Sequence, residues 1–210
     1  MPATRASLRR AAAAMTAHRL IAPREFRRVP WKNGGGHAAE IAAWPTGNPE
    51  GFAWRVAIAE IERDGPFSIY PGVDRTFVLL DGDGVVLVHD DVEVALTVPH
   101  EPYRFSGDSA CMCRLVGGRT RAYNLMVRRD RARGTLVVSD GAAAVPGPFR
   151  FGVCYAASGA SECLLPGYAP IALSPGAALV TDGASAVASM HVNPVDGGAV
   201  AFVAALDADG

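Results

Sequence analysis

Short segments of alternating hydrophobicity, separated by glycine and proline, constrain the fold of this chain more than any other feature. The 210 residues include 23 glycines and 15 prolines, and no window between them supports a long amphipathic helix. In residues 52–61, Trp54 and Val56 would face one side of a strand, while Arg55 and Ala57 would face the other. Strands spaced about ten residues apart, with turns between them, predict an all-β sandwich or jelly-roll barrel.

Further segments show the same strand pattern, and the two halves of the chain look like one architecture repeated. A soft boundary between the halves falls near residues 128–134, which are rich in arginine. The sequence Asp81-Gly82-Asp83-Gly84 predicts a hairpin that pairs residues 76–80 with residues 85–89. Residues 99–107 contain two prolines and are expected to form a loop. The other expected strands are residues 92–98, 110–116, 122–127, 135–138, 149–156, 162–165, 169–173, 177–181, 186–191 and 200–206.

Composition and charge narrow the class of protein. Half of the residues are hydrophobic and a fifth are charged, which is enough apolar material for a packed core. The net charge of −1 gives no general attraction to polyphosphate, so nucleic acid is not expected as a partner. No apolar run approaches the roughly 18 residues that cross a bilayer, so no membrane association is expected. Residues 1–17 are expected to be a frayed tail of a cytoplasmic protein, and a homodimer is left open.

The cysteines and histidines do not indicate a metal or another cofactor. The chain contains no Cys-x-x-Cys, and its five histidines are scattered without the spacing of metal ligands. The four cysteines are expected to be buried thiols in a reducing cytosol, although a Cys154–Cys163 disulfide is left open. The phosphate-binding P-loop and the nucleophile motif G-x-S-x-G are also absent from the sequence.

The run Trp31-Lys32-Asn33-Gly34-Gly35-Gly36 is the strongest candidate for a binding loop. Three consecutive glycines are unfavourable in a regular strand, but they leave backbone N–H groups open to form an anion-binding concavity. Lys32 and Asn33 place a cation and an amide beside that backbone, and Trp31 favours an ordered, packed loop. The alternative interpretation is a flexible loop without a function.

Three later segments contain polar side chains that could complete a site. Arg55 shares its strand face with small residues, so it either faces solvent or projects into a barrel and binds a carboxylate through two hydrogen bonds. Residues 65–75 combine two turns with Ser68 and the Asp74-Arg75 pair, which is either a surface salt bridge or part of the site. Asn124 lies among apolar residues, so a buried partner is expected for its amide.

These segments occur in the order found in the HutD/Ves family, which the chain closely resembles over about residues 19–130. The resemblance implies a bicupin fold, with two cupin-like jelly-roll β-barrel domains that would cover residues 18–130 and 131–210. It also implies an association with histidine utilisation, as a regulator or a metabolite-binding protein. The motifs that carry the resemblance are WKNGGG at 31–36, Glu40-Ile41, Phe52-Ala53-Trp54-Arg55, Gly65-Pro66-Phe67-Ser68, Pro71-Gly72-Val73-Asp74-Arg75, Phe105-Ser106-Gly107, Asn124-Leu125-Met126 and Arg128-Arg129.

The resemblance to cupins that bind a metal fails at their ligand positions. Such cupins carry a His-x-His…Glu group just before the strand and turn that correspond to residues 76–84. Here the preceding residues 67–75 contain no histidine, and neither do residues 103–105, where a later histidine would fall. A site without a metal is therefore expected.

Taken together, these residues predict a pocket in the first barrel for a small carboxylate from histidine breakdown, such as urocanate or a formylated or formimino glutamate. Two arginines would bind the carboxylate, the glycine loop would orient the polar end of the ligand, and aromatic side chains would form an apolar wall. The expected binding residues are Trp31, Lys32, Asn33, Gly34, Gly35, Arg55, Phe67, Ser68, Arg75 and Asn124.

Two alternatives belong to other functional classes. The protein could be a cupin enzyme, an isomerase or hydrolase of a similar acid, with acid–base chemistry from His37, Glu40 or Asp74. That function would require a carboxylate or imidazole with a strongly perturbed pKa inside the pocket. The protein could instead serve as an interaction module, in which case Arg55 and Arg75 would point separately into solvent.

Overall fold

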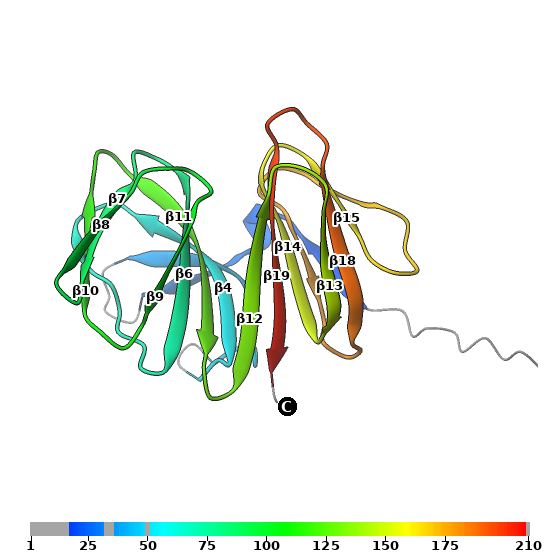
Figure 1. Cartoon of the computed structure of the whole chain (residues 1–210), viewed down its shortest axis with the longest axis horizontal. Coiled ribbons are helices and arrows are strands. Elements are labelled where there is room, and N and C mark those ends of the chain that lie inside the picture. Colours follow the sequence, from blue (N-terminus) through cyan, green and yellow to red (C-terminus); the bar gives the residue numbers. More distant parts are fainter. Residues whose placement is uncertain (1–16, 32–35, 49–50, 209–210) are drawn as a thin grey trace, which may run out of the picture.

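The computed structural model describes residues 17–31, 36–48 and 51–208. Within them the secondary structure is almost entirely strand, with one short 3-10 helix at Pro23–Glu25. The strands form two barrels that lie side by side (Figure 1), which confirms the predicted all-β architecture. In this part of the chain, no helix is long and apolar enough to span a membrane.

The first barrel consists of two antiparallel sheets. Its strands are β2 (Arg27–Pro30), β3 (His37–Trp44), β4 (Trp54–Ile61), β5 (Gly65–Pro66), β6 (Val73–Asp81), β7 (Val85–His89), β8 (Val92–Leu96), β9 (Pro102–Ser106), β10 (Cys111–Leu115) and β11 (Thr120–Arg128). One sheet has the order β2-β3-β4-β11-β6-β9, and the other has the order β5-β10-β7-β8. Apolar side chains from both sheets pack together between them, including Phe77, Leu87 and Cys113.

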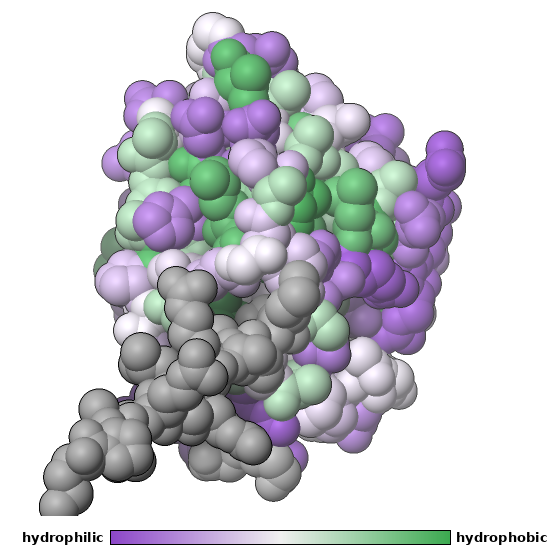
Figure 2. Space-filling view, turned by 90° about the vertical axis from the view of Figure 1, so that its right-hand side faces the viewer, coloured by the Kyte–Doolittle hydropathy of each residue, from purple (hydrophilic) through white to green (hydrophobic). Residues whose placement is uncertain are grey.

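The second barrel has the same two-sheet construction. Its strands are β12 (Ala132–Ser139), β13 (Ala143–Phe149), β14 (Phe151–Ser158), β15 (Ser161–Leu164), β16 (Ile171–Leu173), β17 (Ala178–Thr181), β18 (Val187–Pro194) and β19 (Val200–Ala208), and β1 (His18–Ile21) joins them. The sheets have the orders β1-β17-β14-β19-β12 and β13-β18-β15-β16. On the outer face of this barrel, small apolar areas are interspersed with polar ones (Figure 2).

The position of β1 differs from the predicted division of the chain. Residues 18–21 were expected to open the first domain, but they pair with β17 in the second barrel, with His18 opposite Thr181. The chain therefore begins its described part on the second barrel and then enters the first. In all other respects the domain ranges 18–130 and 131–210 stay a prediction.

The hairpin predicted at residues 81–84 is wrong. β6 and β7 lie in different sheets of the first barrel and do not pair with each other. Gly82 and Gly84 both have φ of +94°, and a Cβ atom on them would lie 2.5 Å and 2.3 Å from the carbonyl oxygens of Arg119 and Leu96. The two glycines therefore allow the chain to cross between the sheets while it packs closely on neighbouring backbone.

The six-stranded sheet of the first barrel packs face to face against the five-stranded sheet of the second. Trp54 and Tyr123 point out of the first barrel into a core that they share with Phe151 and Phe202. The ring centroids lie 5.2 Å apart for Trp54 and Phe151, and 5.1 Å apart for Tyr123 and Phe202. The alternation predicted in residues 52–61 is thus present from Trp54 onward, although both faces of β4 are buried.

The two barrels differ in what fills them. The second barrel is packed with apolar side chains such as Phe149 and Leu179, together with the free thiols of Cys154 and Cys163. The inner face of the first barrel instead carries two buried arginines and an asparagine beside a cavity. The candidate site therefore lies in the first barrel.

Phe202→Ala is expected to destabilise the protein by about 3–5 kcal/mol, because it removes a fully buried ring from the core shared by the barrels. Urea unfolding followed by circular dichroism measures this change. Val195→Ala shortens an exposed side chain and is the control, with an expected change below about 0.5 kcal/mol. A loss below about 1 kcal/mol for Phe202→Ala would contradict a core shared by both barrels.

Candidate functional site

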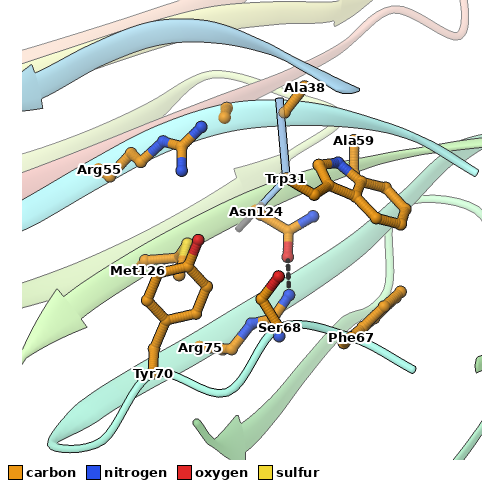
Figure 3. Close-up of a pocket in the computed structure, with 11 residues that line it drawn as sticks. Trp31, Ala38, Arg55, Ala59, Phe67, Ser68, Tyr70, Arg75, Asn124 and Met126 are labelled. Carbon is orange, nitrogen blue, oxygen red and sulfur yellow. Dashed lines mark hydrogen bonds between the residues drawn. The ribbon is translucent and has the colours of Figure 1, made fainter. Parts of the chain in front are cut away.

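A small cavity lies on the inner face of the six-stranded sheet (Figure 3). The space open to the centre of a water-sized molecule is about 50 Å³, which is room for several water molecules or one small organic ligand. Its walls are mostly apolar, with a few polar groups contributed by separate strands and by the segment before β6. The lining residues are Trp31, Ala38, Arg55, Ala57, Ala59, Phe67, Ser68, Tyr70, Arg75, Asn124 and Met126.

Strand register brings the polar residues of the cavity together. Asn124 of β11 lies opposite Ala57 of β4, while Met126 lies between Arg55 of β4 and Arg75 of β6. Because side chains alternate along a strand, all of these residues face the inside of the barrel, and their neighbours in sequence face the second barrel. The same alternation therefore builds both the cavity and the contact between the barrels.

The guanidinium of Arg75 is buried without a carboxylate partner among the described residues. It lies 4.9 Å from the ring centroids of both Phe67 and Phe105, and one terminal nitrogen donates a hydrogen bond to Oδ1 of Asn124 at 3.2 Å. Its Nε has no hydrogen-bond partner in the part of the chain that the structure describes. Burial lowers the pKa of Arg75 to about 10, and the positive charge of Arg55 contributes to this shift. Arg75 therefore remains charged at neutral pH.

Arg55 contributes a second cation, and one side of its guanidinium is already paired. Its Nε lies 2.9 Å from Oε2 of Glu40, and both side chains are more than nine-tenths buried. Oε1 of the same carboxylate accepts a hydrogen bond from the half-exposed Arg27 at 2.6 Å. Figure 3 shows the terminal nitrogens of Arg55 pointing into the cavity above Asn124. The cavity thus contains two guanidinium groups, and among the described residues a carboxylate compensates only that of Arg55.

The loop between β2 and β3 contributes Trp31 to the wall. The N–H of Trp31 donates a hydrogen bond to the carbonyl of Gly36 at 2.8 Å. A Cβ atom on Gly36 would lie 3.2 Å from three carbons of the indole, so glycine at this position lets the backbone pack on the ring. The indole meets Phe67 edge to face, with the centroids 6.0 Å apart. The anion-binding role predicted for Lys32, Asn33, Gly34 and Gly35 falls outside the described residues.

An ionic cluster on the surface holds the segment that precedes β6. Asp108 accepts hydrogen bonds from the N–H of Gly72 at 2.5 Å and from the hydroxyl of Ser106 at 2.7 Å. Arg129 binds both Asp108 and Asp74. The hydrogen bond from Gly72 is the main cause that lowers the pKa of Asp108 to about 2. Asp74 therefore belongs to this cluster and not to the cavity.

The predicted binding residues within the described part of the chain lie around one cavity. They are Trp31, Arg55, Phe67, Ser68, Arg75 and Asn124. Sequence reasoning missed Tyr70 and Met126, as well as the pairing of Glu40 with Arg55. Met126 could have been found, because it lies two residues after Asn124 and so shares its strand face.

The groups expected for an enzyme lie elsewhere. His37 is exposed at the start of β3, Asp74 is part of the surface cluster, and Glu40 is held by two arginines. Among the described lining residues there is no carboxylate or imidazole. Among the described lining residues, the phenol of Tyr70 is the group that belongs to a type used in general acid–base catalysis.

The donor groups of the cavity do not fit a metal ion. Two guanidinium groups face the cavity and would repel a cation. The described residues contain no group of three or more His, Cys, Asp or Glu side chains that could hold a metal. Guanidinium, amide and hydroxyl groups are instead suited to bind an anion.

Comparison with known sequences identifies relatives over most of the chain. The HutD family model matches residues 23–198. A protein of Pseudomonas putida, described as an uncharacterized 21.2 kDa protein in the hutC 3' region, is 38% identical over 127 residues, which cover 60% of this chain and 67% of that protein. Protein Ves of Citrobacter koseri is 36% identical over 140 residues, which cover 65% of this chain and 72% of Ves.

Solved structures share the arrangement of two barrels. A conserved protein of unknown function from Pseudomonas aeruginosa has a TM-score of 0.81 at 28% identity, and HutD from Pseudomonas fluorescens in a formate condition has a TM-score of 0.77 at 29% identity. Each match covers 92% of this chain and 100% of the other. A pirin from Escherichia coli in complex with nickel(II) matches with a TM-score of 0.60 at 12% identity, which shows the cupin-like fold alone.

Asp108→Asn is expected to loosen residues 67–75, because the neutral amide loses the ionic contact with Arg129. Hydrogen exchange at neutral pH should be faster there than in the wild type. The folded pKa of Asp108 is lowered, so its stabilising effect is full above the ordinary carboxyl pKa near 4 and is lost as the pH falls through about 2. The difference in Tm between the two proteins should shrink over that range.

Glu62→Gln is the matched control, since this exposed carboxylate lies 3.8 Å from its partner Arg119. It should leave exchange in residues 67–75 unchanged. Equal exchange of Asp108→Asn and wild type at neutral pH would show that the surface cluster does not hold this segment.

Proposed function

Because the chain belongs to the HutD family, we propose that its first barrel binds a small carboxylate metabolite without a metal ion, in a role connected with histidine utilisation. The family and the relative from the hutC region support the connection with histidine utilisation. An acid from histidine breakdown, such as urocanate or a formylated or formimino glutamate, would be the ligand, and its binding would regulate the pathway.

The buried and uncompensated charge of Arg75 is the observation that carries this proposal. Removing an ion from water costs several kcal/mol in a real protein, and a favourable contact with an aromatic face returns about 0.5–2 kcal/mol. One hydrogen bond to Asn124 and two phenyl rings therefore leave the guanidinium incompletely satisfied. A carboxylate that accepts two hydrogen bonds would supply both the missing charge and the missing acceptors.

The remaining walls fit the body of such a ligand. A carboxylate at Arg75 would lie near the terminal nitrogens of Arg55, with Ser68 and Asn124 beside it (Figure 3). Trp31 and other apolar side chains would then enclose the hydrocarbon part. This combination of an apolar wall and a few convergent polar groups is typical of small-molecule sites.

Arg75→Met is expected to weaken carboxylate binding by about 100-fold or more, because a buried charge partner worth about 3–5 kcal/mol is lost. The Tm without ligand should stay the same or rise, since no carboxylate among the described residues would be left unpaired by the loss of this cation. Isothermal titration calorimetry with urocanate and formate, together with thermal unfolding, measures both effects.

Arg121→Met is the control for this substitution. Arg121 lies on β11 like Asn124, but its half-exposed guanidinium binds Asp81 at the surface. Binding should be unchanged in this variant. Undiminished binding in Arg75→Met, or no binding of any candidate acid to the wild type, would contradict the proposed function.

Carboxylate affinity is expected to be constant from about pH 6 to 9 and to fall at higher pH as Arg75 loses its proton near pH 10. Affinity falls as the pH rises because the ligand binds the charged form of Arg75, which loses its proton as the pH passes the pKa of this residue in the folded protein. Calorimetry across this range tests the prediction, with circular dichroism to verify folding at each pH. A fall in affinity centred near pH 6.5 would instead indicate a histidine.

A further inference from the structure

We propose that Glu40 determines the charge of the ligand, so that the cavity accepts monocarboxylates and discriminates against dicarboxylates. This inference rests on the proposed function, because it concerns the same cavity. Glu40 does not line the cavity, but its Oε2 lies 2.9 Å from Nε of Arg55 and its side chain is buried. It would therefore act on the ligand through Arg55.

The charges of the described residues around the cavity leave room for one anion. Arg55 and Arg75 contribute two positive charges, and the carboxylate of Glu40 compensates the first of them. Arg75 has no carboxylate partner within the described part of the chain. One bound carboxylate would neutralise the remaining charge, whereas a second would give the buried site a net negative charge.

Arg27 does not change this balance at the cavity. It binds the other oxygen of Glu40, on the side of a cleft between the barrels, and about half of its side chain is exposed. Water and salt therefore screen its charge much more than that of the buried Arg55. Its main effect is to hold the Glu40 carboxylate in place, with Oε2 directed at Arg55.

A second carboxylate on the ligand would meet two unfavourable surroundings. Near Arg55 it would approach the buried carboxylate of Glu40, and like charges repel strongly where water is excluded. On the other side it would lose its hydration against the apolar walls formed by Trp31, Phe67 and Met126. The site therefore favours a ligand with one carboxylate and an uncharged body. Among the acids proposed above, this selects urocanate over the formylated and formimino glutamates, each of which carries two carboxylates.

Calorimetry with a matched pair of small acids tests this inference on the full chain at neutral pH. Crotonate and fumarate have the same planar four-carbon frame and differ by one negative charge. Crotonate should bind the wild-type protein at least about tenfold more tightly than fumarate. Monomethyl fumarate has one negative charge fewer than fumarate, so it should bind the wild-type protein more tightly than fumarate does.

Glu40→Gln should raise the affinity for fumarate relative to crotonate by about tenfold, because the amide removes the repulsion while keeping the shape of the side chain. Glu93→Gln, which removes an exposed carboxylate paired with Arg114, is the control and should leave the ratio unchanged. A Glu40 that only supports the fold would weaken both acids equally and leave the ratio unchanged.

The outcomes separate this inference from the proposed function. Binding of formate and crotonate with equal or tighter binding of fumarate to the wild type would overturn the inference and leave the carboxylate site intact. An unchanged ratio in folded Glu40→Gln would also overturn it. If Glu40→Gln does not fold, the inference is tested by the affinities of the wild-type protein for crotonate, fumarate and monomethyl fumarate. Failure of formate, crotonate, urocanate and the formylated and formimino glutamates to bind would overturn both proposals.

Discussion

The rest of the site depends on the burial of the Arg75 guanidinium, whose positive charge is not paired with a carboxylate among the described residues. A buried arginine without an acid is costly, and its lowered pKa reflects that cost. The two phenyl rings and Asn124 hold the guanidinium in place without neutralising it. This is the character expected of a receptor that is preorganised for an anion, and under the proposed function the ligand would supply the missing partner.

The six-stranded sheet makes this arrangement stable by being buried on both faces. One face packs against the second barrel through aromatic residues such as Trp54, Tyr123 and Phe202. Because these contacts already stabilise the sheet, its other face can carry polar residues and a cavity. The second barrel packs against this sheet, and its interior among the described residues is mostly apolar, with exceptions such as the buried hydroxyl of Ser161.

Local sequence patterns were enough to predict most strands and several of the described residues that line the cavity. Alternation placed Arg55 on the face opposite Trp54, and the motif order grouped Arg75 and Asn124 with it. The failures have physical causes. Residues 102–106 and 143–149 form strands despite their prolines, because β9 and β13 lie at sheet edges where a missing N–H is tolerated. The role of Glu40 required knowledge of a tertiary contact, since its partner Arg55 lies on a neighbouring strand.

The guanidinium Nε–H signals in NMR spectra test the central claim most directly, with the signal of Arg75 assigned by its absence in Arg75→Met. The protein would be titrated with a carboxylate at neutral pH. The account predicts that the Arg75 signal shifts to saturation with the Kd found by calorimetry, because the ligand occupies donors that are unpaired in the free protein. Saturable carboxylate binding that leaves the Arg75 signal unchanged would contradict it.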